Sequence, residues 1–144
     1  MKILIVNGPN LNMLGKRDVQ VYGSKTLTEV IQDLAKTAEC LGVSYDHFQS
    51  NSEGEIIDHL QSVKDLTDGI LINAGALTHC GLSLRDALID SRVPIVEVHI
   101  SNIHAREEYR RHSVIEDIAV GQIAGIGWRG YSLALIALIN FLNR

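Results

Sequence analysis

The chain has 144 residues, a length typical of one domain with its own hydrophobic core. Hydrophobic residues make up 46% of it and charged residues 21%, which is ordinary globular composition and excludes wholesale disorder. The 17 acidic residues outnumber the 13 lysines and arginines, so the basic excess typical of nucleic-acid binding is missing. An anionic ligand would have to be held by local charge.

Cys40 and Cys80 are too few for a disulfide framework, and we interpret them as free thiols of a reducing cytoplasm. The N-terminal apolar run at residues 3–6 is too short for the core of a signal peptide. The longest apolar stretch, residues 133–139, falls short of the roughly 20 residues that span a bilayer. The sequence therefore predicts a cytoplasmic protein that does not enter the membrane.

Hydrophobic periodicity predicts alternating strands and helices. Residues 3–6 are typical of a strand buried on both faces, and a loop rich in glycine and asparagine follows from 7 to 24. Thr26 and Glu29 have the spacing of a capping box that opens an amphipathic helix, which Gly42 ends. A second box, Ser52 with Glu55, would open another helix. Further strands are predicted at 43–48, 69–73, 94–100 and 122–126, and further helices at 82–91, 105–112 and 131–142.

This order predicts an α/β fold, in which one catalytic domain spans residues 1–144. The expected architecture is a flavodoxin-like, five-stranded parallel sheet in the order 2-1-3-4-5 with helices on both faces. In such sheets ligands bind beyond the carboxyl ends of the strands, at the point between strands 1 and 3 where the strand order reverses. The last helix is apolar nearly all round, so it is either sandwiched within the domain or in contact with another subunit. The small size of the chain favours a subunit contact.

Polar residues follow predicted strands 1, 3 and 4, and we expect them to converge on one rim of the sheet. They are Asn7, Asn10, Asn12, Arg17 and Tyr22 after the first strand, Asn73, Gly75 and His79 after the third, and Glu97, His99, Ser101, Asn102, Arg106 and Arg110 at the end of the fourth.

Two pairs in this rim suit acid–base chemistry, although each also has a purely structural interpretation. Arg17 and Tyr22 lie in a loop of a length typical of functional loops. They are either a solvated arginine and a half-buried tyrosine, or a lid in which the guanidinium favours the phenolate. Glu97 and His99 lie two residues apart and so point to the same face of their strand. They are either a structural pair or a carboxylate that orients and charges a general acid.

Metal and nucleotide motifs are not supported. His79, Glu97 and His99 lack the tight spacing of zinc motifs, so we predict no metal site. The G-x-G-x-x-G pattern of residues 125–130 lacks the downstream strand and acidic residue of a dinucleotide site, because the chain ends 14 residues after Gly130. Its glycines suit a tight strand-to-helix turn instead.

Several motifs in order carry a resemblance to a known family. They are residues 7–15 (NGPNLNMLG), Arg17 with 22–23 (YG), 48–51 (FQSN) with 53–54 (EG), 73–79 (NAGALTH) with 85–87 (RDA), and 97–102 (EVHISN) with 104–108 (HAREE). Over nearly its whole length the chain resembles type II 3-dehydroquinate dehydratase. The resemblance implies a dodecamer of four trimers that uses no metal, cofactor or Schiff base. It also implies dehydration of 3-dehydroquinate to 3-dehydroshikimate by anti elimination through an enolate, in the shikimate pathway or in quinate breakdown.

The resemblance also implies a role for each rim residue. Tyr22 is expected to be the base that takes the C2 proton as a phenolate, Arg17 its activator, and His99 the acid that protonates the leaving C1 hydroxyl. Asn10 would hold a water on the enolate oxygen. Asn73 would bind the leaving hydroxyl, and Ser101 and the amide of Ile100 would bind the substrate carboxylate. His79 and Arg110 would bind the ring hydroxyls. Asp86 would reach in from a neighbouring subunit, and Glu97 would support His99.

The chain departs from the family pattern at Asp18-Val19, Ser52 and Cys80-Gly81, none of which has an assigned chemical step. These departures bear on rate and inhibitor preference. Two other function classes stay open. A flavodoxin-like module for FMN or phosphate would need a Ser/Thr-rich cradle or an acidic pocket after strand 1, which residues 7–15 do not provide. A non-catalytic scaffold would not need every assigned catalytic residue type, yet all of them are present.

Overall fold

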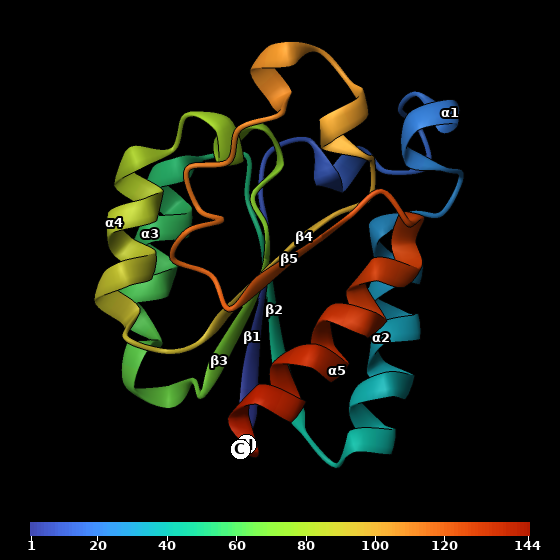
Figure 1. Ribbon diagram of the computed structural model, residues 1–144. Coiled ribbons are helices and arrows are strands. Elements are labelled where there is room, and N and C mark those ends of the chain that lie inside the picture. Colours follow the sequence, from blue (N-terminus) through green and yellow to red (C-terminus); the bar gives the residue numbers. More distant parts are fainter.

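A five-stranded parallel sheet forms the centre of the computed structural model, which describes residues 1–144 (Figure 1). The strand order is β2-β1-β3-β4-β5, and each neighbouring pair is parallel. This confirms the predicted fold and order. The strands are β1 (Lys2–Asn7), β2 (Ser44–Gln49), β3 (Gly69–Asn73), β4 (Ile95–His99) and β5 (Gly121–Ala124).

Two pairs of helices cover the sheet (Figure 1). Helices α2 (Leu27–Leu41) and α5 (Gly130–Leu142) pack on one face, and α3 (Glu53–Ser62) and α4 (Leu82–Ser91) on the other. A one-turn helix, α1 (Val19–Tyr22), stands apart beyond the carboxyl ends of the strands. Short 3-10 turns occupy Leu11–Met13, Lys64–Leu66, Gly75–His79, Ile103–Ala105, Glu108–Arg110 and Gly127–Arg129.

The alternation of β1 explains why this strand is buried on both sides. Ile3 and Ile5 belong to the core beneath α2 and α5, whereas Leu4 and Val6 belong to the core beneath α3 and α4. A strand at the centre of a parallel sheet has no solvent face, and its sequence is accordingly a continuous apolar run. The run ends at Asn7, which is also fully buried and therefore needs hydrogen-bond partners.

The two predicted capping boxes have different outcomes. At α2 the box is complete, because the Glu29 N–H donates to the Thr26 hydroxyl at 3.2 Å and the Thr26 N–H donates to the Glu29 carboxylate at 2.8 Å. At α3 only half of it forms. The Glu55 N–H donates to the Ser52 hydroxyl at 3.3 Å, but the Glu55 carboxylate accepts from the hydroxyl of Ser50 instead of from the Ser52 backbone.

The predicted charged helix at 105–112 is wrong. The segment contains the 3-10 turns Ile103–Ala105 and Glu108–Arg110, separated by Arg106 in an extended conformation (φ −102°, ψ −161°). No apolar stripe holds the segment against the sheet as a helix, and the extended backbone lets Arg106 reach Tyr22. The 7–24 loop also contains more structure than predicted, because Asp18 caps α1 by accepting from the Gln20 N–H.

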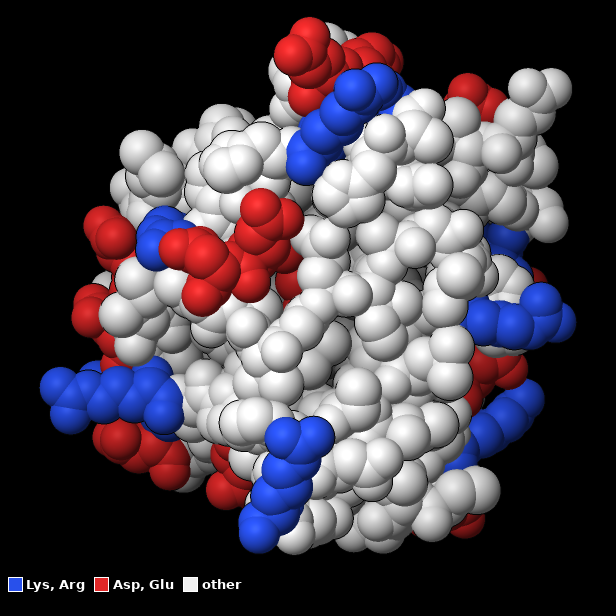
Figure 2. Space-filling model, viewed as in Figure 1, with Lys and Arg blue, Asp and Glu red and all other residues white.

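Helix α5 buries one face and exposes the other. Leu133 and Ile136 on its outer face are 48% and 36% exposed, and Val120 and Ile126 beside β5 are exposed as well. We call these four residues the α5–β5 surface. Figure 2 shows that this side of the molecule has few charged side chains at its centre. Exposed apolar surface of this kind is typical of interaction sites. None of the helices has the length and apolarity needed to cross a membrane.

Candidate active site

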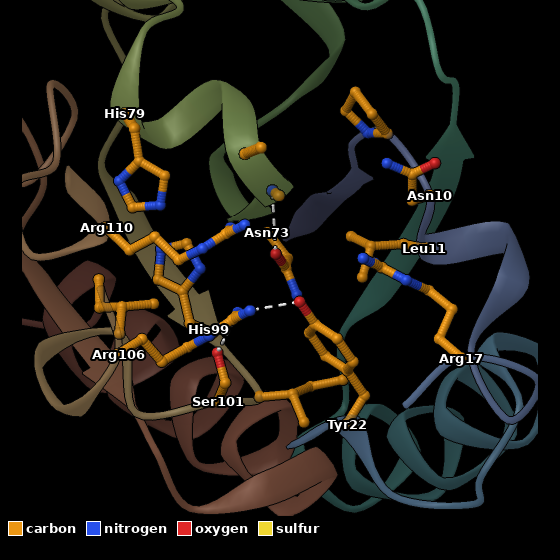
Figure 3. Close-up of a pocket in the computed structure, with 15 residues that line it drawn as sticks. Asn10, Leu11, Arg17, Tyr22, Asn73, His79, His99, Ser101, Arg106 and Arg110 are labelled. Atoms are coloured by element: carbon orange, nitrogen blue, oxygen red, sulfur yellow. Dashed lines mark hydrogen bonds between the residues drawn. The ribbon is translucent and has the colours of Figure 1, made fainter. Parts of the chain in front are cut away.

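A pocket opens at the carboxyl ends of β1, β3 and β4 (Figure 3). It encloses about 500 Å³ of space, including open solvent at its mouth. Of the residues with a predicted role, all except Asp86 and Glu97 line it, whereas the rim residues Asn7, Asn12 and Asn102 do not. The lining consists of Pro9, Asn10, Leu11, Arg17, Tyr22, Asn73, Gly75, Ala76, His79, His99, Ile100, Ser101, Ile103, Arg106 and Arg110.

The charged side chains of the pocket are all basic. Arg17, Arg106 and Arg110 line it together with His79 and His99, and no carboxylate does. Arginine stays protonated at every working pH, so at least three positive charges face the cavity. The pocket therefore attracts an anion although the chain as a whole carries a net charge of −4.

Two arginines surround Tyr22. Arg106 Nη1 donates to the Tyr22 hydroxyl at 2.9 Å (Figure 3). The Arg17 guanidinium carbon lies 4.4 Å from the centroid of the Tyr22 ring. Two positive charges therefore lie against the Tyr22 side chain, one at its oxygen and one over its ring. The sequence placed Arg106 in the rim without a role. Sequence reasoning missed that Arg106 has an extended backbone, which brings its guanidinium to Tyr22. The only sequence signal for this contact is the position of Arg106, five residues after Ser101.

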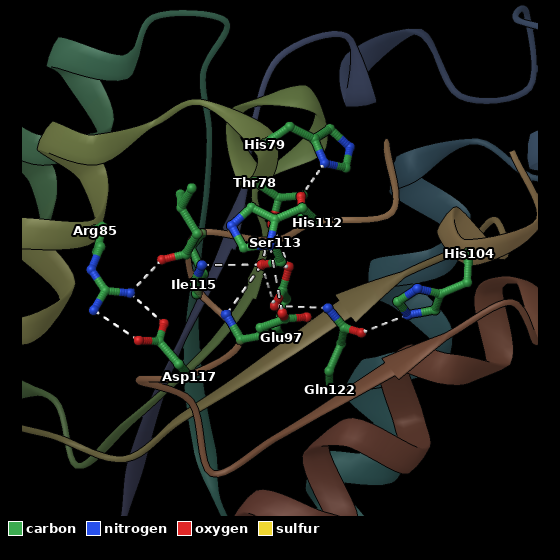
Figure 4. Close-up of polar contacts among 12 residues, drawn as sticks. Thr78, His79, Arg85, Glu97, His104, His112, Ser113, Ile115, Asp117 and Gln122 are labelled. Carbon is green, nitrogen blue, oxygen red and sulfur yellow. Dashed lines mark hydrogen bonds and ion pairs between the residues drawn. The ribbon is translucent and has the colours of Figure 1, made fainter. Parts of the chain in front are cut away.

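Glu97 and His99 form the predicted same-face pair on β4, and Figure 4 shows Thr78, Ser113 and Gln122 around the Glu97 side chain. His99 Nε2 lies 2.6 Å from Glu97 Oε1, and this carboxylate has no exposed surface. It also accepts hydrogen bonds from the side chains of Thr78, Ser113 and Gln122. Burial raises the pKa of Glu97, but the hydrogen bond and charge of His99, with the bonds from Thr78 and Gln122, outweigh this effect and lower the pKa below its ordinary value.

The ionised Glu97 sets the orientation of His99. Because Nε2 contacts the carboxylate, Nδ1 is the ring nitrogen left for a ligand in the pocket. A carboxylate so placed holds the imidazole in one orientation, with one ring nitrogen bound behind the pocket and the other turned to it. His79 is held in a similar way, since its Nδ1–H donates to the carbonyl oxygen of His112 at 2.8 Å and leaves Nε2 free.

The loop after β1 brings Asn10 to the pocket in an uncommon conformation. Its φ of 69° is in the left-handed region, which asparagine tolerates better than most residues. The Asn10 N–H donates to the side-chain oxygen of Asn51 at 2.9 Å, which holds the loop against the end of β2. The glycine at position 8 is required here, because a Cβ would lie 2.4 Å from the carbonyl oxygen of Ala74.

Asp86 does not line the pocket of its own chain. It is exposed on α4, and its predicted contact is with a neighbour's site. Glu97 lies behind His99 and reaches the pocket only through that ring. No group of three or more His, Cys, Asp or Glu side chains is arranged to hold a metal ion.

A cationic pocket with a tyrosine between arginines and a histidine on a buried glutamate defines an α/β enzyme class that acts on small anions by acid–base chemistry. The family model described as "Dehydroquinase class II" matches residues 1–139. The chain thus belongs to the class II dehydroquinase family.

Full-length relatives agree with this assignment. Proteins named 3-dehydroquinate dehydratase from Prochlorococcus marinus subsp. pastoris and Roseiflexus castenholzii are 52% and 56% identical, over 99% and 97% of this chain and 98% and 89% of their own lengths. The crystal structure of type II dehydroquinase from Butyrivibrio crossotus has a TM-score of 0.91 at 43% identity, covering 100% of this chain and 98% of that one.

Proposed function

We propose that this chain is a 3-dehydroquinate dehydratase of the shikimate pathway, with residues 1–144 as one catalytic domain. The observation that carries the proposal is that Tyr22 and His99, each with its own charged partner, line one cationic pocket. A carboxylate-bearing polyol suits such a pocket. An FMN or phosphate module is not favoured, because family membership and the acid–base pairs both point to dehydration.

Proton removal is the first step of the proposed reaction. The proton at C2, next to the ketone, is too weakly acidic for a neutral phenol to remove. Tyr22 therefore acts as a phenolate, stabilised by Arg106 at its oxygen and by Arg17 over its ring. The C–H electron pair moves toward the ketone and forms an enolate. Asn10 holds a water that hydrogen-bonds to the enolate oxygen.

Loss of the hydroxyl is the second step. His99, charged beside Glu97, donates a proton to the C1 hydroxyl as the C1–O bond breaks. The enolate electrons form the new C1–C2 double bond, and water leaves. One C–H and one C–O bond break, one C–C π bond forms, and a proton moves from Tyr22 back to His99 to restore the enzyme. The anti elimination implied by the family resemblance requires base and acid to act from opposite faces of the ring.

The remaining pocket residues bind the substrate. The hydroxyl of Ser101 and the amide of Ile100 lie at the end of β4 and hold the carboxylate, while His79 and Arg110 hold ring hydroxyls. Asn73, at the end of β3, holds the leaving hydroxyl. These roles need no metal or organic cofactor.

The direct test is addition of 3-dehydroquinate to the purified protein. The product is a conjugated enone, so absorbance in the ultraviolet should grow with time. The matched variants Tyr22→Phe and Tyr45→Phe each lose one hydroxyl, and only the first should lose at least the ~10²-fold typical of general-base catalysis. An unaltered protein that produces no enone, or one that copurifies with a yellow flavin, contradicts the proposal.

The assembly proposed for the chain is a dodecamer of four trimers. Its support is the family resemblance, the exposed Asp86 of α4 and the α5–β5 surface. If Asp86 completes a neighbour's site, mixing inactive Asp86→Ala subunits with inactive Tyr22→Phe subunits should restore part of the activity after dissociation and reassembly. A fully active monomer in light scattering would contradict the shared site.

The cytoplasm is the proposed compartment, because both cysteines are exposed thiols that suit a reducing environment. Fractionation of the producing cell should recover the dehydratase activity with cytoplasmic markers, and recovery outside the cytoplasm would contradict this.

A further inference from the structure

Tyr131 lies beneath the pocket without lining it. It belongs to the first turn of α5 and is 1% exposed. Its hydroxyl donates to Asn7 Oδ1 at 2.6 Å and accepts from Asn73 Nδ2 at 2.8 Å. The two asparagines end the central strands β1 and β3 and face each other in register. A tyrosine in an apolar helix buries its hydroxyl only where partners exist, and here both partners lie at the edge of the site.

The hydrogen bonds around Tyr131 form a series in which each group accepts from the one before it and donates to the next. The Gly75 N–H donates to Asn73 Oδ1 at 3.1 Å, and the Asn7 side-chain N–H donates to His47 Nε2 at 3.0 Å. Reversing the Asn73 amide would turn its Nδ2 toward the Gly75 N–H, which sets two donors face to face at a buried residue. The Gly75 N–H and the Tyr131 hydroxyl therefore hold the two ends of the Asn73 amide in one orientation.

We infer that Tyr131 is a positioning residue that, together with the Gly75 N–H, fixes the Asn73 amide with its donor end available to the substrate. An asparagine amide has a donor end and an acceptor end of nearly the same size, so packing alone does not distinguish them. Because Tyr131 donates to Asn7, its oxygen can only accept from Asn73. Nδ2 must then face Tyr131, and its second N–H is left for a ligand oxygen in the pocket.

The state of the Tyr131 hydroxyl supports this direction. Burial raises the pKa of Tyr131, so the group stays a phenol and keeps its proton for Asn7 at every working pH. The inference rests on the proposed function for the identity of the ligand oxygen, the leaving hydroxyl. It goes beyond that function by adding a residue that touches neither substrate nor reacting atoms.

Tyr131→Phe is the test, since it keeps the ring in the core and removes only the hydroxyl. We expect kcat to fall about tenfold with little change in KM, because Asn73 would lose its fixed donor to the leaving group as the C–O bond breaks. The matched control is Tyr45→Phe. Tyr45 is a half-buried tyrosine on β2 whose hydroxyl makes no hydrogen bond, and the control should stay within about twofold of the unaltered enzyme.

A double variant separates positioning from a general loss of structure. In an Asn73→Ala background, Tyr131→Phe should change kcat less than about twofold, because the group that it orients is gone. A tenfold loss that persists in this background would overturn the inference. So would a Tyr131→Phe enzyme as active as the Tyr45→Phe control.

Asn7→Leu provides a second approach if Tyr131→Phe does not fold. Asn7 does not line the pocket, and its replacement removes the acceptor that directs the Tyr131 hydroxyl. The same kcat loss is expected, and an unchanged kcat would overturn the inference.

A crystal structure of Tyr131→Phe tests the inference without activity, and so separates its failure from that of the proposed function. The Nδ2 end of the Asn73 amide should move from its position in the unaltered enzyme, because its hydroxyl partner is gone, and an unmoved amide would contradict the positioning role.

Discussion

Replacing Arg106 by glutamine tests how the Tyr22 hydroxyl becomes a base. The variant keeps a polar side chain of similar length but removes the positive charge 2.9 Å from the phenolic oxygen. The Arg106 side chain is only 22% exposed, so solvent screens this contact weakly. A hydrogen bond to a charged group contributes about 1.5–3 kcal/mol, which corresponds to a roughly 10–150-fold loss in kcat/KM.

The pH profile of kcat/KM, followed by absorbance of the enone, distinguishes activation from substrate binding. The acidic limb reports formation of the base, so removal of a cation should move it to higher pH. Arg111→Gln is the matched control, because it makes the same charge change at an exposed arginine outside the pocket. An Arg106→Gln profile with an unmoved limb and a higher KM alone would refute the activation and leave Arg106 as a binding residue.

Three further predictions concern the buried carboxylate of Glu97, the cap of helix α2 and metal dependence. The lowered pKa of Glu97 contributes stability that is present above the ordinary value of 4.5 and is lost as the pH falls below it. Urea unfolding at descending pH should therefore show a shallower decline for Glu97→Gln, and an equal decline would contradict the assignment. Thr26→Ala should lower the free energy of unfolding by about 1 kcal/mol through loss of the α2 cap, whereas the exposed Thr28→Ala on the same helix should not, and kcat should stay unchanged in both. Extended treatment with a chelator should leave the dehydratase rate intact, and a metal-restorable loss would contradict the cofactor-free mechanism.

Patterns that depend on local periodicity and burial were predictable from the sequence. The apolar run of β1, the Thr26–Glu29 box and the Glu97–His99 spacing each determine a local structure whatever surrounds them. Strand order followed because parallel strands joined by helices have few allowed topologies. The same topology predicted the pocket, since it brings the carboxyl ends of β1, β3 and β4 together.

Features that depend on partners distant in sequence were not predictable in the same way. The 105–112 segment has helix-forming charges, but Arg106 adopts an extended backbone that brings its guanidinium to Tyr22, 84 positions away. The sequence around Tyr131 is nearly all apolar and predicts only a helix, with no role for the tyrosine hydroxyl. Its role depends on Asn7 and Asn73, which only the folded sheet brings beneath it. The only sequence signal is the tyrosine itself, because a buried tyrosine hydroxyl needs a hydrogen-bond partner.

The central claim is anti elimination of water from 3-dehydroquinate with Tyr22 and His99 on opposite faces of the ring. The most direct measurement uses two substrates, each carrying deuterium at one of the two C2 positions, with product mass as the readout. The account predicts that deuterium anti to the leaving hydroxyl is lost and that deuterium syn to it is retained in the enone. Loss of the syn deuterium, or no product from either substrate, would contradict it.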